Sequence, residues 1–243
     1  MFNPIFLALA LTVHADAAAL LQAADAPRAA FLQSIIEVRA TIRETDKPDK
    51  FAEFELYVGG EDRQLVIFKD EKNKGRKFIT NGDKTWLIAP NASRPVAITA
   101  RQRLIGGASF ADVARVRLSK DYSGELRDQP EPCGEPARPC QVLDIRATSK
   151  AAPYTTGILW IDDKGLVRKA VYALASGKPA REAHFDYRES AGRATLSKAV
   201  IVDLLSGEQA LTTTLEYLHY RQTPMPDELF DPERAVEPLS AER

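Results

Sequence analysis

Three short runs decide the fold of this 243-residue chain: GEDRQLVIF at 60–68, KGRKFI at 74–79 and DKTWLIAP at 83–90. Each run mixes apolar and charged residues over the length of a strand, and turn residues such as Asn81-Gly82 separate the runs. None of them contains an acid pair spaced for general acid–base catalysis, a metal-ligand cluster or a nucleophile beside a base. They therefore predict a sheet with an apolar face, which suits a container better than a catalyst.

The strand pattern extends along the chain in both directions. Short turns indicate that neighbouring strands pair antiparallel, and the lack of strand–helix alternation argues against a doubly wound α/β fold. A sheet of about eleven strands must curl or close. Strands are predicted near 51–58, 62–70, 75–81, 84–90, 96–99, 122–128, 141–148, 155–162, 166–174, 180–188, 195–204 and 209–220.

Two segments read as helical. In 26–45 apolar residues recur at steps of three and four, which predicts an amphipathic helix. These residues are Phe31, Ile35, Val38 and Ile42. In 101–117 a helix is predicted over 110–116, with Ser109 as its N-cap, and the Gly106-Gly107 pair before it fits either a flexible lid or a plain connection. The pattern therefore predicts a mainly β fold with one curled antiparallel sheet, and the two helical segments would cover one mouth or face of it.

The N-terminus carries a short apolar run, IFLALALTV at 5–13, followed by a small-x-small site at 15–17. The run is too short to span a bilayer as a helix, so it predicts a signal peptide over 1–17. An apolar first helix of the domain is the alternative, because 1–4 carry no Lys or Arg. No cysteine follows the run, so we expect export without a lipid anchor. A domain over 18–231 and a flexible tail over 232–243 complete the expected organisation.

Composition and cysteine usage narrow the function classes. The formal net charge is -1 and the pI is near 6.4, which gives no basic footprint for nucleic acid. Cys133 and Cys140 are the two cysteines of the chain, and they flank a Pro-rich loop. An even count in an exported chain favours a disulfide there over a metal site.

Catalytic motifs are weak. The run GASFA at 107–111 is loosely similar to a nucleophile elbow, but it lacks the final Gly and lies in an antiparallel context. His184 and His219 lie in strand patterns beside aromatic residues, where an ordinary sheet histidine is the simpler reading. We therefore expect no enzyme, no cofactor and no metal.

Nine pieces of the chain match a known family: 62–63, 74–79, 82–90, 107–112, 140–145, 154–162, 172, 177–178 and 227–230. In their order and spacing, these pieces together resemble the outer-membrane lipoprotein-sorting (LolA-like) family, over about 51–231. The fold class that this resemblance implies is mainly β (α+β): a single strongly curved, half-open antiparallel β-barrel of about eleven strands with helices covering its concave face. The implied role is that of a monomeric periplasmic carrier or chaperone for acyl chains of lipids or lipoproteins, moving towards the outer membrane.

The carrier hypothesis assigns residues to a cavity, a lid and a rim. Predicted wall residues are Phe54, Leu56, Phe68, Phe78, Trp86, Leu143, Ile145, Leu159 and Ile161, and predicted lid residues are Leu104, Ile105 and Phe110. Predicted contacts to a lipid head group or a partner are Arg63, Arg101, Arg103, Arg115 and Arg117. The structural alternative for Arg63 is an ion pair with Asp62 in its own turn. The structural alternative for the other four arginines is a solvated basic face.

A second hypothesis from the same resemblance is a non-enzymatic sensor or adaptor. Such a module, of the RseB type, would bind a protein partner such as the periplasmic domain of an inner-membrane exporter or an anti-sigma factor. A fully packed interior favours this reading, whereas a bound acyl lipid favours the carrier. An inner-membrane lipid exporter or an outer-membrane acceptor is the candidate protein partner in either case.

Overall fold

The computed structural model describes residues 16–29, 32–60, 62–115, 117–190, 192–207 and 211–236, with the side chains of 28, 29, 114 and 115 left aside. Most of the predicted signal peptide and residues 237–243 of the predicted tail lie outside this description. Within the described ranges, no helix has both the length and the apolar character needed to cross a membrane.

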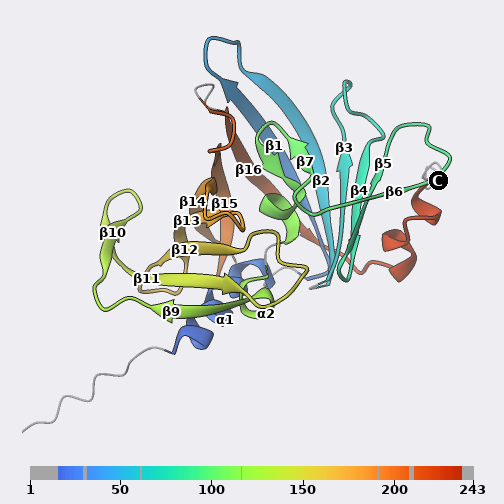
Figure 1. Cartoon of the computed structure of the whole chain (residues 1–243). Coiled ribbons are helices and arrows are strands. Elements are labelled where there is room, and N and C mark those ends of the chain that lie inside the picture. Colours follow the sequence, from blue (N-terminus) through green and yellow to red (C-terminus); the bar gives the residue numbers. More distant parts are fainter. Residues whose placement is uncertain are drawn as a thin grey trace, which may run out of the picture.

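The described chain is dominated by strands, which Figure 1 shows as one strongly bent sheet. Its helical elements are α1 (Ala17–Ala29), the π-helix η1 (Ala111–Arg115), α2 (Leu118–Asp121) and the 3-10 turns η2 (Asp227–Phe230) and η3 (Arg234–Val236). The first strands are β1 (Ser34–Glu44), β2 (Lys50–Gly60), β3 (Arg63–Phe68), β4 (Lys77–Asn81), β5 (Lys84–Ile88), β6 (Val96–Ile98), β7 (Arg103–Ile105) and β8 (Ala108–Ser109). The remaining strands are β9 (Tyr122–Leu126), β10 (Glu131–Cys133), β11 (Arg138–Ala147), β12 (Thr156–Ile161), β13 (Val167–Ala173), β14 (Pro179–Ser190), β15 (Arg193–Asp203) and β16 (Leu211–Gln222).

Fourteen of these strands form one sheet in the order β10-β11-β12-β13-β14-β15-β16-β1-β2-β3-β4-β5-β6, with β9 paired to β11. Its pairings are antiparallel, as predicted, but the prediction of about eleven strands was too low. Among the described residues no pairing joins β6 to β10, so the sheet is open rather than a closed barrel. Figure 1 shows β9–β13 and β3–β6 diverging from the central strands, with β7, α1 and α2 between the two arms.

The predicted helix over 26–45 is wrong, because most of that range forms β1, a central strand that pairs with β2 and β16. Ile36, Val38, Ala40 and Ile42 are buried at period two, which is a strand signature. β-branched residues also favour strands over helices. The helix lies earlier, at α1, where Asp16 accepts a hydrogen bond from the Ala18 amide at 3.1 Å. Cleavage after Ala17 would remove this N-cap.

The two faces of the sheet carry two separate apolar clusters. The larger cluster lies on the concave face and includes Leu20, Leu21 and Ala24 of α1. The smaller one lies on the outer face of β3–β5, where Leu65, Ile67, Ile79 and Ile88 point. Met225, Phe230, Ala235 and Val236 of the C-terminal segment (223–236) cover it. Residues 227–230 of this segment form the 3-10 turn η2, and its packing against the outer cluster extends to 236.

Contacts from distant residues hold the C-terminal segment in place. The Phe230 ring is fully buried against Gly59, and the Arg63 guanidinium pairs with Asp227. The Lys77 ammonium donates a hydrogen bond to the Ala235 carbonyl at 2.6 Å. At the other end of the molecule, the predicted Cys133–Cys140 disulfide closes the β10–β11 hairpin.

We predict that Gly59→Ala loosens the C-terminal segment. A Cβ at residue 59 would lie 2.2 Å from Phe230 Cε2, whereas a Cβ at the neighbouring Gly60 meets only the Arg63 guanidinium at 3.7 Å. Gly59→Ala should therefore lower the free energy of unfolding by about 2 kcal/mol more than Gly60→Ala. Urea unfolding measures the difference, and limited proteolysis should cut within 223–236 faster. Equal unfolding free energies and equal rates of proteolysis in the two variants would contradict the packing of Phe230 against Gly59.

Candidate functional site

The concave face of the sheet is filled by a hairpin plug, which we define as β7, β8 and η1, residues 103–115. Leu104 and Phe110 of the plug are fully buried. The Phe110 ring stacks on Phe78 with 6.1 Å between ring centroids, and Phe78, Phe68 and Phe54 continue as a row with 6.2 Å and 5.4 Å spacings. The plug thus supplies the last ring of an aromatic row that the sheet begins.

The structure brings most predicted wall and lid residues together in this concave cluster. The buried members are Phe54, Leu56, Phe68, Phe78, Leu104, Phe110, Leu143, Ile145, Leu159 and Ile161, and Ile105 packs against them partly buried. Trp86 is instead in the outer cluster, and its neighbour Leu87 packs against the concave one. Alternation along β5 is the signal that separates the two, because successive strand residues point to opposite faces.

The tip of the plug explains the Gly106-Gly107 pair. Gly106 has φ +54°, and a Cβ there would lie 2.5 Å from Thr213 Oγ1 and 2.8 Å from Ile42 Cγ1. The Gly107 amide donates a hydrogen bond to Thr213 Oγ1 at 2.9 Å. The pair is therefore a tight hairpin turn pressed onto β1 and β16, where glycine allows both the left-handed backbone and the close approach.

A polar latch, Asp112, Arg181 and Asp203, ties the plug to the sheet. The Asp112 carboxylate accepts hydrogen bonds from the Ser109 amide at 2.7 Å, the Ser109 hydroxyl at 2.8 Å and the Tyr154 hydroxyl at 2.7 Å. Burial raises the pKa of Tyr154 far above its usual value, so this hydroxyl stays a donor. Ser109 and Tyr154, which donate these hydrogen bonds to Asp112, are themselves buried.

Arg181 of β14 completes the latch between two carboxylates. Its Nη1 donates to Asp203 Oδ1 at 2.6 Å, and its Nε lies 3.6 Å from Asp112 Oδ2, within ion-pair but not hydrogen-bond distance. Arg103 at the start of the plug approaches Asp203 at 3.5 Å from the solvent side. Buried charges are costly unless they are paired, so removing one member is expected to destabilise the plug. Sequence reasoning missed this latch because its members are far apart in the chain.

The predicted cationic residues do not gather on one surface. Arg63 pairs with Asp227 on the outer side, and Arg103 contacts the latch. Arg101 is exposed just before the plug, and the Arg115 side chain lies outside the described residues. Among the described residues, Asp62 and Arg63 do not pair with each other. Arg63 binds Asp227, and Asp62 binds Arg117.

Arg117 is enclosed by carboxylates. Its guanidinium binds Asp62, lies 3.1 Å from Asp83 and 3.0 Å from Asp121, and only 11% of its side chain is exposed. Burial acts to lower the pKa of Arg117, but the hydrogen bonds with Asp121 and Asp62 outweigh burial and raise it. Lys120 also binds Asp62, at 2.7 Å. This cluster anchors the chain just after the plug to the β2–β3 and β4–β5 turns.

The residues considered for catalysis are not assembled. Ser109 is buried and donates its hydroxyl proton to Asp112, whereas His184 is exposed on β14 and contacts Glu182 at 2.7 Å. Phe185 and Ala183, on either side of His184, point into the concave cluster, so His184 points to the outer face. Within the described ranges, no group of three or more His, Cys, Asp or Glu residues could hold a metal ion.

Comparisons with known proteins agree with this architecture. A model of an uncharacterized protein family matches residues 60–234, and no curated protein matches the chain. A LolA superfamily protein from Nitrosomonas europaea is 19% identical with a TM-score of 0.78, and the match covers 88% of this chain and 97% of that one.

Two further solved structures share the fold. A proposed outer membrane lipoprotein-sorting protein domain from Vibrio parahaemolyticus is 16% identical, with a TM-score of 0.71 over 89% of this chain and 98% of that one. A DUF1329 family protein from Desulfovibrio piger is 17% identical, with a TM-score of 0.73 over 88% and 97%. At these identities the likeness shows the fold.

We predict that Gly106→Ala displaces the tip of the plug. Gly177 is a matched control, because it also has a positive φ, +80°, but a Cβ there meets nothing within 4 Å. Both alanines should cost about 1–2 kcal/mol of stability for the left-handed backbone. Gly106→Ala should cost about 1–3 kcal/mol more, because overpacking against Thr213 and Ile42 is added. Urea unfolding measures both, and equal losses would show that the tip is not closely packed.

A second prediction concerns the pH dependence of the Asp62 cluster. Burial acts to raise the pKa of Asp62, but hydrogen bonds from Lys120 and Arg117 outweigh burial and lower it. A lowered folded-state pKa gives stability that is present above about pH 4 and lost as pH falls through that pKa. Asp62→Asn should therefore cost about 1 kcal/mol or less at pH 6, since the side chain is 36% exposed, and nearly nothing at pH 2.5.

Urea unfolding of wild type and Asp62→Asn at the two pH values tests this. Asp83→Asn is the control, because Asp83 contacts the same arginine but is 69% exposed, and it should change stability less. If the difference in unfolding free energy between wild type and Asp62→Asn is larger at pH 2.5 than at pH 6, the assigned interaction of Asp62 with Arg117 and Lys120 is wrong.

Proposed function

We propose that this chain, which belongs to the uncharacterized protein family matched over 60–234 and has the LolA fold, carries acyl chains of lipids or lipoproteins. The proposal includes export by the 1–17 signal peptide, action as a monomer in the periplasm and transfer towards the outer membrane. It includes no catalytic step. An inner-membrane exporter or an outer-membrane acceptor is the proposed protein partner.

The observation that carries the proposal is the hairpin plug on the apolar concave face. The interior is enclosed by the fourteen-stranded sheet, α1 and a separate thirteen-residue segment that contains only the short two-stranded sheet β7–β8. The plug contributes Leu104, Phe110 and Val113, each at most 3% exposed. An acyl chain is chemically equivalent to these side chains, so it could replace them against Phe54, Phe68 and Phe78.

The energies are compatible with such an exchange. Burying a sixteen-carbon chain stabilises by roughly 0.8 kcal/mol per CH2, or about 12 kcal/mol. Exposing the three apolar plug side chains costs roughly 1.5–3 kcal/mol each, or about 5–9 kcal/mol. The acyl chain therefore offsets the loss of the plug contacts, and the surplus is available to break the polar latch.

The latch sets how the carrier would open. Asp112 and Arg103 are on the plug, whereas Arg181 and Asp203 are on β14 and β15, so plug movement separates the charged partners. Water that enters with the movement would solvate them and lower the cost of separation. The Arg117 cluster holds the chain just after the plug at the base of the sheet, which supports a swing of the tip rather than loss of the whole segment.

The sensor or adaptor reading remains a second candidate, because the concave cluster is filled by side chains in this structure. In that reading the plug is a fixed part of the core, and a protein partner binds outside it. The two candidates differ in one measurable property, which is the uptake of an acyl chain.

The test is native mass spectrometry of protein purified from periplasm without detergent, with organic extraction of bound molecules. The carrier reading expects a co-purifying acyl lipid, and it expects Gly106→Ala to take up a fluorescent fatty acid several times faster than Gly177→Ala. A clean apo mass together with no uptake by wild type or Gly106→Ala would overturn the carrier in favour of the adaptor.

A further inference from the structure

Arg76 places its guanidinium against the aromatic row of the concave face. Its Cζ atom lies 5.6 Å from the centroid of the Phe68 ring and 5.0 Å from the centroid of the Phe78 ring. Both distances are within the range of a cation–π contact, which reaches to about 6 Å. Because Phe78 also stacks on Phe110, the cation, the sheet and the plug meet at one ring.

Strand register explains why Arg76 faces inward. Arg76 directly precedes β4, and its carbonyl accepts a hydrogen bond from the Phe68 amide at 3.1 Å, so the two residues are cross-strand neighbours. Successive residues of a strand point to opposite faces. Phe78 therefore shares the concave face with Arg76, whereas Lys77 between them points outward and binds the Ala235 carbonyl.

The partly buried Arg76 side chain lacks a counter-ion. Within the described part of the chain, its guanidinium has no ion pair and no hydrogen bond. Burial lowers the pKa of Arg76, and no carboxylate acts to raise it. Arg63, Arg103 and Arg117, in contrast, each bind a carboxylate. A cation that is partly removed from water and has no partner favours an external anion.

Charged residues of the same hairpin leave the surroundings of the guanidinium positive. The segment 69–76 carries four basic and two acidic side chains. The acidic ones are Asp70, which accepts hydrogen bonds from Asn73, and Glu71, which is exposed. Neither forms an ion pair with the guanidinium among the described contacts. Lys69 has a carboxylate partner on β2, and the other charges of the segment still sum to a positive value.

An apolar strip of the concave face leads from Phe78 to the edge strand β6. Leu87 of β5 pairs with Phe78 on one side and with Val96 of β6 on the other. Cross-strand partners share a face. Exposure rises along this line, because Phe78 is fully buried, Leu87 is partly buried and Val96 is 56% exposed. The strip therefore gives an apolar chain a surface that begins at the sheet edge and ends beside the cation.

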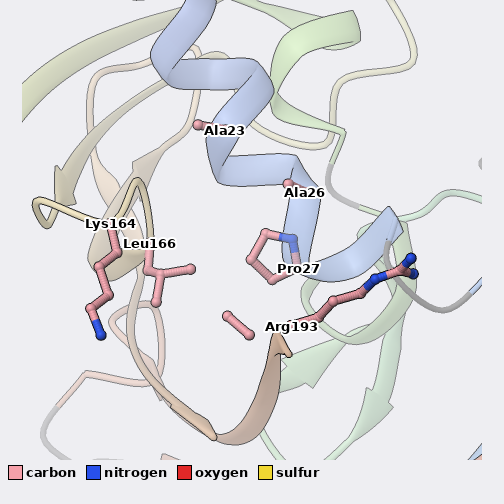
Figure 2. A pocket seen from close by; sticks show the side chains of 7 residues that line it. Ala23, Ala26, Pro27, Lys164, Leu166 and Arg193 are labelled. Atoms are coloured by element: carbon pink, nitrogen blue, oxygen red, sulfur yellow. The ribbon is translucent and has the colours of Figure 1, made fainter. Parts of the chain in front are cut away.

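Position separates Arg76 from the cations beside α1. A pocket of about 480 Å³ there is lined by part of α1 and by residues that include Lys164, Leu166 and Arg193. Figure 2 shows the charged ends of Lys164 and Arg193 pointing away from the space between Pro27 and Leu166. The Arg76 guanidinium, in contrast, lies against the apolar rings themselves.

We infer that Arg76 is the head-group receptor of the carrier: its guanidinium binds the carboxylate or phosphate of an anionic amphiphile whose chain lies along Phe68 and Phe78. The inference rests on the proposed carrier function and deepens it by naming the ligand class. A guanidinium binds either anion with two parallel hydrogen bonds. When the plug tip swings out, Phe110 leaves the ring that Arg76 also contacts, so a chain that replaces Phe110 has its charged end beside the cation.

The experiment is isothermal titration calorimetry of the purified protein with three amphiphiles of equal chain length, each below its micelle concentration. They are dodecanoate, dodecyl phosphate and the cationic dodecyltrimethylammonium. Arg76→Met removes the charge but still covers the rings, so it should bind both anions about tenfold more weakly and the cation at least as tightly as wild type. Arg76→Lys keeps the charge and should recover most of the affinity for the anions.

Two controls address charge and chain. Lys74→Met, at an exposed position of the same turn, should change the affinity for the anions less than about twofold. Inorganic phosphate has the anion without the chain and should bind far more weakly than dodecyl phosphate. If it binds as tightly, the site takes a free anion rather than an amphiphile, and the inference is wrong. Dodecanoate and dodecyl phosphate distinguish a carboxylate from a phosphate preference.

The other outcomes separate this inference from the function it rests on. If Arg76→Met weakens dodecyltrimethylammonium as much as the anions, Arg76 only covers the rings. Equal losses of anion affinity in Arg76→Met and Lys74→Met would assign the attraction to the net charge of the turn. If Arg76→Met binds all three ligands like wild type while Gly106→Ala still takes up the fluorescent fatty acid, the head-group assignment falls and the carrier stands. If neither wild type nor Gly106→Ala takes up any amphiphile, both proposals fall.

Discussion

The structure depends on one constraint, which is that a bent antiparallel sheet has an apolar concave face that its own strands cannot cover. Fourteen strands supply that face, and Phe54, Phe68 and Phe78 form its centre. A sheet needs a second layer to bury such a surface. Here the layer consists of α1 and a hairpin whose Phe110 extends the aromatic row. Because this layer is small and comes from separate segments, the opening proposed for the carrier would involve only one part of it.

Polar contacts fix the position of the plug on the sheet. An apolar hairpin against an apolar wall can slide, since burial has no preferred direction. Asp112 and Gly107 remove that freedom, because each makes a hydrogen bond to a group at one place, Tyr154 and Thr213 respectively. In the proposed opening, water that enters would solvate the partners of these bonds and so lower the cost of breaking them. Apolar packing thus supplies the stability of the interior, and the few polar contacts select one arrangement of it.

Sequence periodicity predicted most of the sheet, because alternating strands between short turns leave a strong local signal. It failed at β1, where Ile35, Val38 and Ile42 fit helical spacing as well as strand spacing, and only pairing with β2 and β16 decides between them. It placed most wall residues on the concave face but assigned Trp86 instead of Leu87, since residue size outweighed alternation. The ion-pair partners of Arg63 and Arg117 were not predictable, because Asp227 lies 164 residues from Arg63 and Asp62 lies 55 residues from Arg117.

The pairing of β1 with β16 has a consequence for how the chain is made. Residues 34–44 form the centre of the sheet only when 211–222 are beside them, and the Gln33 side chain accepts a hydrogen bond from the Met225 amide. A chain that emerges from its N-terminus first must therefore keep its central strand unpaired on one edge until nearly the whole sequence is available. Contacts of such long sequence separation form slowly, and an unpaired edge of this kind invites association with other chains. Synthesis thus exposes an aggregation-prone intermediate, and the yield of folded protein depends on how long that edge stays unpaired.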